Sequence, residues 1–377
     1  MKKIEMVDLK SQYAKIKDEV DAKVIEVIES SAFIKGPEVK AFEKELATYL
    51  DVKHTIGCAN GTDALQLAMM ALDLQPGDEV ITSNFTYVAT AEAIALLKLT
   101  PVLVDNFSDD FGINPEEIEK AISPRTKAIV PVHLFGQCAD MEAIMGIAKK
   151  HNLYVIEDNA QAIGADYTFS DGRKMKAGTI GDIGTTSFFP SKNLGCMGDG
   201  GAIFTNNDEL AEKLKMVANH GQVKTYYHDF VGINSRLDSI QAAILRIKLR
   251  YLDSYCDARR KAADYYDKGF ADVNGLESPA RVDNSTHVFH QYVLKLDEKY
   301  DRDGMLDFLR ANDIPCNVYY PVPLNMQKAY AMDVNERGFP VTELLCKTVF
   351  ALPIHTEFEQ EQQDYIIEKV KEYLAKS

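Results

Sequence analysis

Between residues 55 and 205, short β-branched runs alternate with segments of helical periodicity. The strand-like runs are DEVITSN, TPVLVD, KAIVPVH and YVIED, and the helical segments are TDALQLAMMALDL, TYVATAEAIALLK, INPEEIEKAI and DMEAIMGIAKKH. Strands that alternate with helices of this length form βαβ units and a mainly parallel sheet with helices on both faces. We therefore predict an α/β fold for this part of the chain.

Ligands of such a sheet bind beyond the carboxyl ends of its strands. The residues that follow the four runs are 84–87, Asp105, His133 and Asp158. We expect the functional site among them.

After about residue 235 the pattern changes. A long amphipathic helix is predicted over 239–270, followed by a smaller α+β region with strands at 289–296 and 316–322 and helices at 301–313 and 359–377. We predict a large domain over 1–245 and a small C-terminal domain over 246–377. No linker rich in Gly, Ser or Pro separates them, so the two are expected to pack together.

Composition excludes several classes of partner. The chain has 42 Lys+Arg and 57 Asp+Glu, a formal net charge of −15, and no long basic run, which argues against nucleic acid. No stretch reaches the roughly 18 apolar residues of a membrane helix. The first residues do not resemble a signal peptide, and the six scattered cysteines suit reduced thiols, so we expect a cytoplasmic protein.

The histidines and cysteines give no metal motif. His287 and His290 form the one close histidine pair, within THVFHQYVLKL. This segment alternates like a strand, and positions i and i+3 of a strand point to opposite faces. We therefore predict no metal site.

Three segments carry candidate chemistry. In GCANGTDALQLAMMAL, Gly61 and Thr62 precede an apolar-periodic helix whose first N–H groups can bind an anion such as phosphate. The same pattern also fits an ordinary capped helix without a ligand.

The second segment, LYVIEDNAQAIGADY, places Asp158 at the top of a buried strand. A carboxylate there is costly to desolvate unless a positive group meets it. That group is either an Arg or Lys of the protein or a cationic ligand, and the pattern alone leaves both open.

The third segment, GDIGTTSFFPSKNLGCMGDGGAIFTNN, contains Lys192 in a polar loop before a run of glycines. A lone lysine is commonly a solvated surface charge. The glycine density instead suggests backbone held close to a ligand, with Lys192 available as a nucleophile.

A phosphate-binding turn, an acid that can pair with a ring cation, and a lysine in a glycine-rich loop are together what a pyridoxal phosphate (PLP) site needs. With these motifs the chain resembles the DegT/DnrJ/EryC1/StrS family of sugar aminotransferases. The resemblance extends over nearly the whole chain, through VDLKSQY, FIKGPEVKAFEKELATYL, ANGTDAL, EDNAQA, SFFPSKNLG, VGINSRLDSIQAAIL, YYPVPLN and LPIHTEF.

The resemblance implies the PLP-dependent transferase fold, which is aspartate aminotransferase-like and of fold type I. Lys192 matches the lysine that forms the internal aldimine and later carries a proton. Asp158 matches the acid that keeps the pyridine nitrogen protonated, and Gln161 matches the residue beside the 3-hydroxyl of the cofactor.

Further cofactor contacts follow from the same resemblance. Gly61 and Thr62 match the phosphate-binding turn, and Ser187 matches a further phosphate ligand. Tyr87 matches the aromatic residue that stacks on the ring. Asn234 matches an asparagine that reaches the phosphate from the neighbouring subunit, which implies a homodimer with shared active sites.

Arg236 is expected to contact the anionic substrate, and Tyr319 and Tyr320 to bind it. This chain departs from the family at Asn159, where a small residue is more common, and at Tyr319, where related enzymes often have His. The departure at Tyr319 concerns the identity of the substrate rather than the chemistry.

The resemblance implies transfer of an amino group from L-glutamate to a keto group, the 3-oxo group in the branch that YYPVPLN resembles, of a nucleotide-linked sugar. A 4-oxo sugar is the close alternative. Two other activities stay open, a PLP-dependent sugar dehydratase and a non-catalytic PLP-binding regulator. Lys192 favours transamination over dehydration, because the dehydratases of the family have histidine there.

Overall fold

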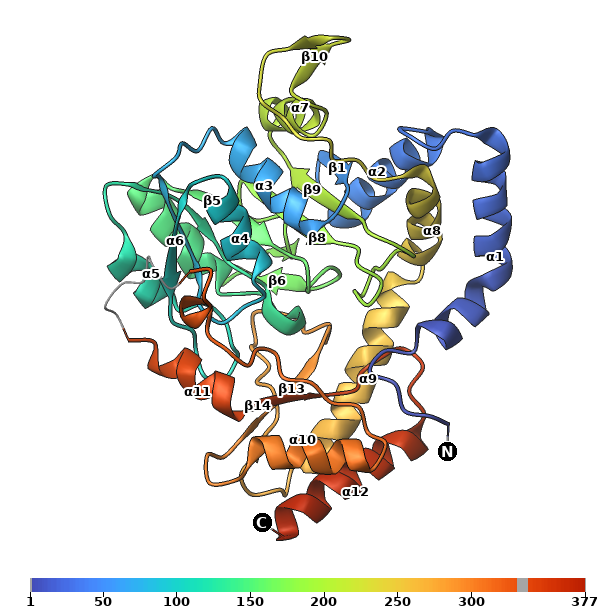
Figure 1. Ribbon diagram of the computed structural model, residues 1–377, viewed down its shortest axis with the longest axis vertical. Coiled ribbons are helices and arrows are strands. Elements are labelled where there is room, and N and C mark those ends of the chain that lie inside the picture. The colour runs from blue at the N-terminus through green and yellow to red at the C-terminus, as the bar shows by residue number, and fades with distance from the viewer. Residues whose placement is uncertain (1, 331–337, 377) are drawn as a thin grey trace.

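The computed structural model describes residues 2–330 and 338–376. A larger upper part is built around a central sheet, and a smaller lower part contains the C-terminal elements (Figure 1). The helices of the upper part are α1 (Leu9–Ser30), α2 (Pro37–Leu50), α3 (Gly61–Ala71), α4 (Ala89–Leu96), α5 (Pro115–Ala121), α6 (Met141–His151), α7 (Asp208–Val217) and α8 (Ser239–Leu249).

Seven strands of the described chain form the central sheet, in the order β1-β9-β8-β5-β4-β2-β3. Strands β3, β2, β4, β5 and β8 are parallel neighbours, whereas β9 pairs antiparallel with both β8 and β1. Their bounds are β1 (His54–Cys58), β2 (Glu79–Ser83), β3 (Thr100–Val104), β4 (Thr126–Val130), β5 (Tyr154–Asp158), β8 (Ile183–Ser187) and β9 (Gly201–Thr205). The predicted mainly parallel sheet is confirmed.

Two apolar layers enclose this sheet. On one face, residues of α2, α6 and α8 pack against it, and Phe42 and Phe188 meet edge to face at 5.4 Å between ring centroids. On the other face, residues of α3, α4 and α7 pack against the same strands. Burial of both sheet faces explains why the strand runs are apolar throughout rather than alternating.

The lower part has its own core, around Tyr266, Tyr292 and Phe350. Its elements are α9 (Leu252–Phe270), α10 (Arg302–Ala311), α11 (Pro340–Thr348), α12 (Gln360–Lys376) and a three-stranded sheet of β12 (Leu276–Glu277), β13 (Tyr292–Leu296) and β14 (Val349–Leu352). Ile4 packs into this core, and Gln362 donates to the carbonyls of Lys2 and Lys3, so the start of the chain lies against the first turn of α12 (Figure 1).

Two predicted elements differ in the structure. The helix predicted over 239–270 is divided into α8 and α9, because Arg250 and Tyr251 donate to carbonyls three residues back instead of four. The strand predicted over 316–322 is reduced to one bridge, between Asn317 and Ala351. The domain boundary at residue 245 stays a prediction.

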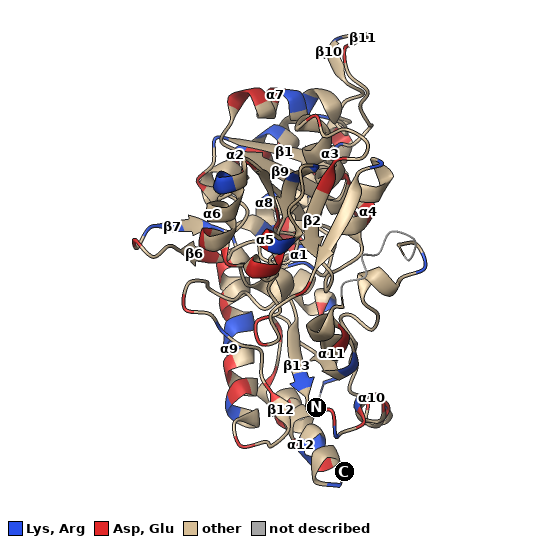
Figure 2. Cartoon of the chain, turned by 90° about the vertical axis from the view of Figure 1, so that its left-hand side faces the viewer, with Lys and Arg blue, Asp and Glu red and all other residues tan. Residues whose placement is uncertain are grey.

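Two small hairpins lie outside the main sheets. One consists of β6 (Asp166–Thr168) and β7 (Lys174–Lys176), and the other of β10 (Gln222–Lys224) and β11 (Tyr227–His228). The second projects from the upper end of the molecule (Figures 1 and 2). Figure 2 also shows that both signs of charge are spread over outer helices such as α7 and α9. No helix in the described residues is long and apolar enough to cross a membrane.

Candidate active site

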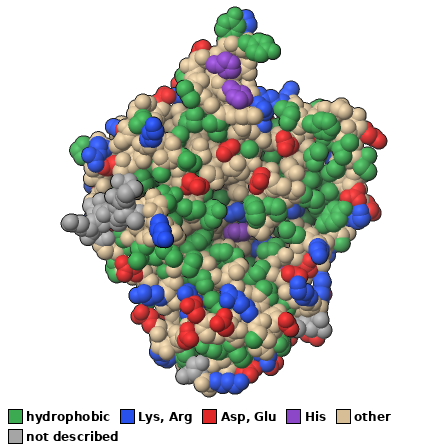
Figure 3. All heavy atoms as spheres, viewed as in Figure 1, with side chains coloured by type: hydrophobic (Ala, Val, Ile, Leu, Met, Phe, Trp, Pro, Cys, Tyr) green, Lys and Arg blue, Asp and Glu red, His purple; other side chains and the backbone are tan. Residues whose placement is uncertain are grey.

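A cavity of about 740 Å³ opens between the two parts of the molecule, beyond the carboxyl ends of β2, β5 and β8. The space-filling view shows a hollow in the middle of this face, in which basic and histidine side chains are visible (Figure 3). The upper part contributes Asn60, Gly61, Thr62, Asp63, Thr86, Tyr87, Asp158, Gln161, Ser187 and Lys192, and the lower part contributes His290, Gln291, Tyr319 and Tyr320.

Asp158 ends β5 and is almost fully buried. Its carboxylate accepts hydrogen bonds from the hydroxyl of Thr90 (2.8 Å) and the backbone N–H of Ala160 (3.1 Å). Among the residues that the structure describes, no Lys or Arg forms an ion pair with it. Of the two partners left open by the sequence, the structure therefore favours a cationic ligand.

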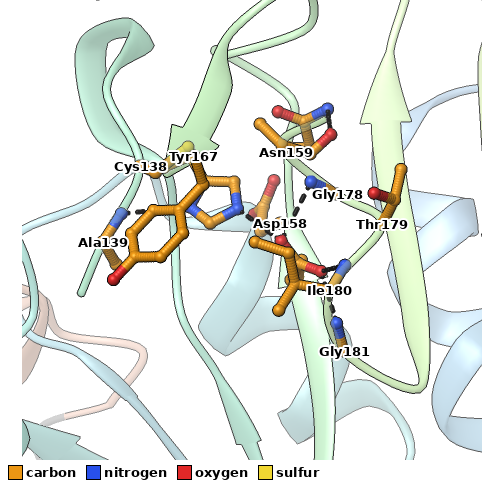
Figure 4. Close-up of polar contacts among 12 residues, drawn as sticks. Cys138, Ala139, Asp158, Asn159, Tyr167, Gly178, Thr179, Ile180 and Gly181 are labelled. Atoms are coloured by element: carbon orange, nitrogen blue, oxygen red, sulfur yellow. Dashed lines mark hydrogen bonds and ion pairs between the residues drawn. The ribbon is translucent and has the colours of Figure 1, made fainter. Parts of the chain in front are cut away.

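The preceding residue, Glu157, anchors the end of the same strand from behind. Its fully buried carboxylate accepts from the backbone N–H groups of Gly178, Ile180 and Gly181 (2.9, 2.5 and 2.6 Å), which converge there (Figure 4). It also bonds His133 Nε2 at 2.8 Å, while His133 Nδ1 accepts from the N–H of Ala139. Alternation along β5 thus directs Glu157 into the structure and Asp158 into the cavity.

Lys192 lies in the loop between β8 and β9, and three contacts hold this loop. The Lys192 N–H donates to the carbonyl of Phe189 (2.8 Å), and the side chain of Asn193 donates to the carbonyl of Val288 (2.9 Å). The buried Lys248 ammonium donates to the carbonyl of Gly195 (2.6 Å). The position of Lys192 is thereby fixed from both parts of the molecule.

Burial lowers the pKa of Lys192 from 10.5 to about 8, and the nearby Asp158 carboxylate opposes this by favouring the ammonium. An amine with a pKa of about 8 is half neutral at pH 8, so the neutral form that a nucleophile or base requires is far more available than in an ordinary lysine. The environment of Lys192 is therefore that of a reactive lysine rather than a solvated surface charge.

The amino terminus of α3 opens into the cavity. Asn60 caps this helix by accepting from the N–H of Asp63 (2.8 Å), so the N–H groups of Gly61 and Thr62 lack an intrahelical acceptor. A side chain at Gly61 would place its Cβ 2.8 Å from that of Ser187, which explains the glycine. The N–H groups of Gly61 and Thr62, together with the hydroxyls of Thr62 and Ser187, suit a phosphate.

Aromatic residues form another wall. Tyr320 stacks on Phe135 (6.4 Å between centroids) and lies 6.4 Å from the ring of Tyr87. Gln161 accepts from the N–H of Phe135 (2.8 Å) and donates to the Tyr320 hydroxyl (3.2 Å). Tyr319 also lines the cavity, and its hydroxyl accepts from Asn317 (3.1 Å).

Two predicted site residues lie elsewhere in this chain. Asn234 is exposed and bridges to Asn219, and Arg236 donates to the side chain of Asn219 at 3.1 Å. Neither lines the cavity of this chain.

Several strand-end residues that the sequence suggested have structural roles. Asp105 accepts from the N–H groups of Val341 and Thr342 and so caps α11, while Asn84 exchanges hydrogen bonds with Asn325. His133 faces Glu157. Of the residues predicted at the ends of the four strands, only residues 86–87 and Asp158 line the cavity.

The glycines after Lys192 were expected to hold backbone close to a ligand, but they lie against other parts of the protein. A Cβ at Gly195 would lie 2.4 Å from the carbonyl of Pro190, and one at Gly201 would lie 2.5 Å from the backbone of Asn60. These glycines allow close contact between chain segments that form the site.

Sequence reasoning missed Thr90, His290 and Gln291. Thr90 lies one turn after Tyr87 in the NFTYVAT motif, which was the available signal. His290 was placed in a strand, but β13 begins only at Tyr292. The chain turns at Phe289, with φ at 45°, and His287 stacks on Phe289 while His290 lines the cavity.

These features fit PLP. Asp158 lacks a protein cation and can face a pyridinium, Gly61, Thr62 and Ser187 can hold the phosphate, and Lys192 can reach the aldehyde carbon. The buried Thr86 hydroxyl, which has no partner among the described residues, adds a further polar group. When bound, PLP supplies the electron sink that stabilises negative charge on the reacting carbon.

The fold and these side chains define a PLP-dependent transferase of fold type I. The model of the DegT/DnrJ/EryC1/StrS aminotransferase family matches residues 14–371, and the chain belongs to this family. It is thus a PLP-dependent aminotransferase by class, and the predicted fold and cofactor are confirmed.

Individual relatives are similar to this chain over nearly its whole length. The chain is 47% identical over 352 residues to the UDP-2-acetamido-2-deoxy-3-oxo-D-glucuronate aminotransferase of Pseudomonas aeruginosa (93% of this chain, 95% of the relative). It is 46% identical over 373 residues to the pleiotropic regulatory protein of Geobacillus stearothermophilus (98% of each). The solved structure of NtdA from Bacillus subtilis with bound PMP superposes with a TM-score of 0.89 at 34% identity (96% of this chain, 82% of that one).

The Thr90 hydrogen bond gives a first prediction. Thr90→Val keeps the shape but removes a donor to Asp158, so we expect kcat to fall about tenfold, while Thr90→Ser keeps most of it. The control is Thr82→Val, because buried Thr82 donates to the Val130 carbonyl (2.8 Å) away from the cavity. Equal kcat in the two valine variants would contradict the assigned role of Thr90.

The pKa of Lys192 gives a second prediction. In the cofactor-free protein we expect acetic anhydride to label Lys192 with a half-maximal rate near pH 8, since only the neutral amine reacts. Asp158→Asn removes the charge that raises this pKa, so the midpoint moves to lower pH. Mass spectrometry of peptides measures both, with Lys3 as a control whose pKa Glu5 holds above its ordinary value. A Lys192 midpoint above pH 10 would contradict this environment.

Proposed function

We propose that the protein transfers an amino group from L-glutamate to the 3-oxo group of a nucleotide-linked sugar. The observation that carries the proposal is the juxtaposition of Lys192 with the uncompensated Asp158 in one cavity. The P. aeruginosa relative is named for a UDP-linked 3-oxo sugar, which supports that substrate class. A cavity of about 740 Å³ is also large enough for cofactor and sugar together.

In this proposal each side chain has a defined task. Lys192 Nζ takes a proton from the donor and returns it during amino transfer, which its lowered pKa permits. Asp158, held by the Thr90 hydroxyl, would pair with the ring nitrogen. Gly61, Thr62 and Ser187 would hold the phosphate, Gln161 would contact the 3-hydroxyl, and Tyr87 would cover the ring.

The remaining residues act in a homodimer. Asn234 and Arg236 follow the projecting β10–β11 hairpin, whose neighbourhood carries apolar side chains that a monomer leaves in water: Tyr226 is 88% and Val231 is 89% exposed. Such a surface suits a second copy of the chain. We propose that Asn234 and Arg236 complete the partner's cavity, while Tyr319 and Tyr320 contact the sugar nucleotide from within the chain.

We also propose a cytoplasmic location, since all six cysteines are free and buried. A regulatory function is the second candidate, because the G. stearothermophilus relative is named a pleiotropic regulatory protein. The reactive environment of Lys192 favours the enzyme.

A turnover measurement tests the proposal. Purified holoenzyme is mixed with L-glutamate and either the 3-oxo or the 4-oxo isomer of a UDP-linked sugar, and mass spectrometry follows the amino sugar. We expect glutamate-dependent product from the 3-oxo isomer, and none from Lys192→Ala. Product from the 4-oxo isomer alone would correct the position of the keto group. Release of a keto product without glutamate would indicate a dehydratase. If neither isomer reacts, the regulatory function is the remaining candidate.

Subunit mixing tests the shared site. Lys192→Ala and Asn234→Ala are each expected to be nearly inactive, but their mixed dimer contains one cavity with both native residues. Refolding equal amounts together should therefore restore about a quarter of wild-type activity. Asp158→Ala, which alters the same cavity as Lys192, serves as the control in place of Asn234→Ala, because its mixed dimer with Lys192→Ala contains no cavity with both native residues. Failure to recover any activity would contradict a shared site.

A further inference from the structure

His290 and Gln291 line the cavity, and each carries a buried polar atom without a partner in the part of the chain that the structure describes. His290 is 8% exposed, and neither its Nδ1 nor the Oε1 of Gln291 has a hydrogen-bond partner among the described residues. Both residues line the same cavity as Lys192. Buried polar atoms are nearly always satisfied in a working protein, so these two indicate a ligand that supplies the missing partners.

The backbone that carries them is held firmly. The guanidinium of Arg259, buried in α9, donates to the carbonyls of Phe289 (3.0 Å) and His290 (3.2 Å). Gly136 lies against the same segment, since a Cβ there would be 2.8 Å from the N–H nitrogen of Phe289. Together with the left-handed turn at Phe289, these contacts fix His290 and Gln291 at the cavity wall.

The chemistry of the pair is neutral. Burial, and then the charges of Lys192 and Arg259, hold the pKa of His290 well below its ordinary value of 6.5, so the imidazole is uncharged at neutral pH. The Oε1 of Gln291 only accepts hydrogen bonds. A carboxylate or phosphate offers no donor to that oxygen, whereas a hydroxyl group can both donate and accept.

We propose that His290 and Gln291 form a neutral hydrogen-bonding subsite beside Lys192 that recognises a hydroxyl group next to the reacting carbon of the sugar. The inference rests on the proposed function and specifies how the sugar, rather than glutamate, is oriented. Both substrates use the same Lys192, but only the sugar offers hydroxyls to this wall. The subsite therefore acts in one half of the reaction.

The variants are chosen to separate this role from a structural one. His290→Leu and Gln291→Met remove the polar atoms and keep similar volumes, while His290→Asn keeps a polar atom close to the position of Nδ1. The matched control is His355→Leu: His355 is also buried with an unpaired ring nitrogen, but it lies outside the cavity lining.

Two measurements on the holoenzyme are needed. The first is the single-turnover rate with L-glutamate, read from the absorbance change of the cofactor. The second is the Kd of a UDP-linked 3-oxo sugar by calorimetry before glutamate is added, when the enzyme has no amino group to transfer and the sugar binds without reacting. UDP alone is titrated as the reference for the nucleotide.

We expect His290→Leu and Gln291→Met to raise the Kd of the sugar about tenfold each, with the Kd of UDP and the glutamate rate changed less than about twofold. His290→Asn should recover most of the sugar affinity. Unchanged sugar affinity, equal loss for UDP and sugar, or the same loss in His355→Leu would overturn the proposal. A wild-type enzyme that reacts with glutamate but binds no sugar would overturn the proposed function, and this subsite with it.

Discussion

The site depends on one buried carboxylate that the protein leaves without a cation. Asp158 is held by the neutral donors Thr90 and Ala160, although removing a charge from water is costly unless an opposite charge meets it. Lys192 forms no ion pair with Asp158, and burial lowers the pKa of Lys192 to about 8, so this amine loses its charge at a lower pH than an ordinary lysine. We propose that the pyridinium of PLP would pair with Asp158 and leave Lys192 as the reactive amine.

The rest of the fold supports this pair. Glu157 anchors the end of β5 through backbone N–H groups, so that the next residue must face the cavity. Asn193 ties the loop of Lys192 to the segment that carries His290 in the lower part of the molecule. Asp105 caps α11, and Asn84 holds Asn325. Residues from both parts are therefore positioned against each other around one cavity.

The sequence was sufficient for the parallel sheet and for the central chemistry. Periodicity predicts β2 to β5 and α3 to α6 in their order along the chain. The strands are recognisable because both of their faces are buried, so their apolar runs are unbroken. Asp158, Gly61 and Thr62 were found because each lies where a local pattern ends, at a strand end or a helix start, whereas Lys192 was found from the glycine run that follows it. Family resemblance, not periodicity, supplied Tyr87, Gln161, Asn234 and Arg236.

Other features depend on contacts between distant segments and leave no local pattern. His290 reaches the cavity because Phe289 takes a left-handed conformation that Arg259 and Gly136 enforce from elsewhere in the chain. The glycines after Lys192 were read as contacts to a ligand, whereas they allow contact with Pro190 and Asn60. The division between α8 and α9 similarly lacks a Gly or Pro that would mark it.

The most direct test of this account is the location of the cofactor on the chain. Holoenzyme treated with sodium borohydride keeps the cofactor fixed to the amine that carries it, and mass spectrometry of its peptides identifies that amine. The account predicts the added mass on Lys192 in the wild-type protein and its complete absence from Lys192→Ala. The same mass on the buried Lys248, or on no lysine at all, would contradict it.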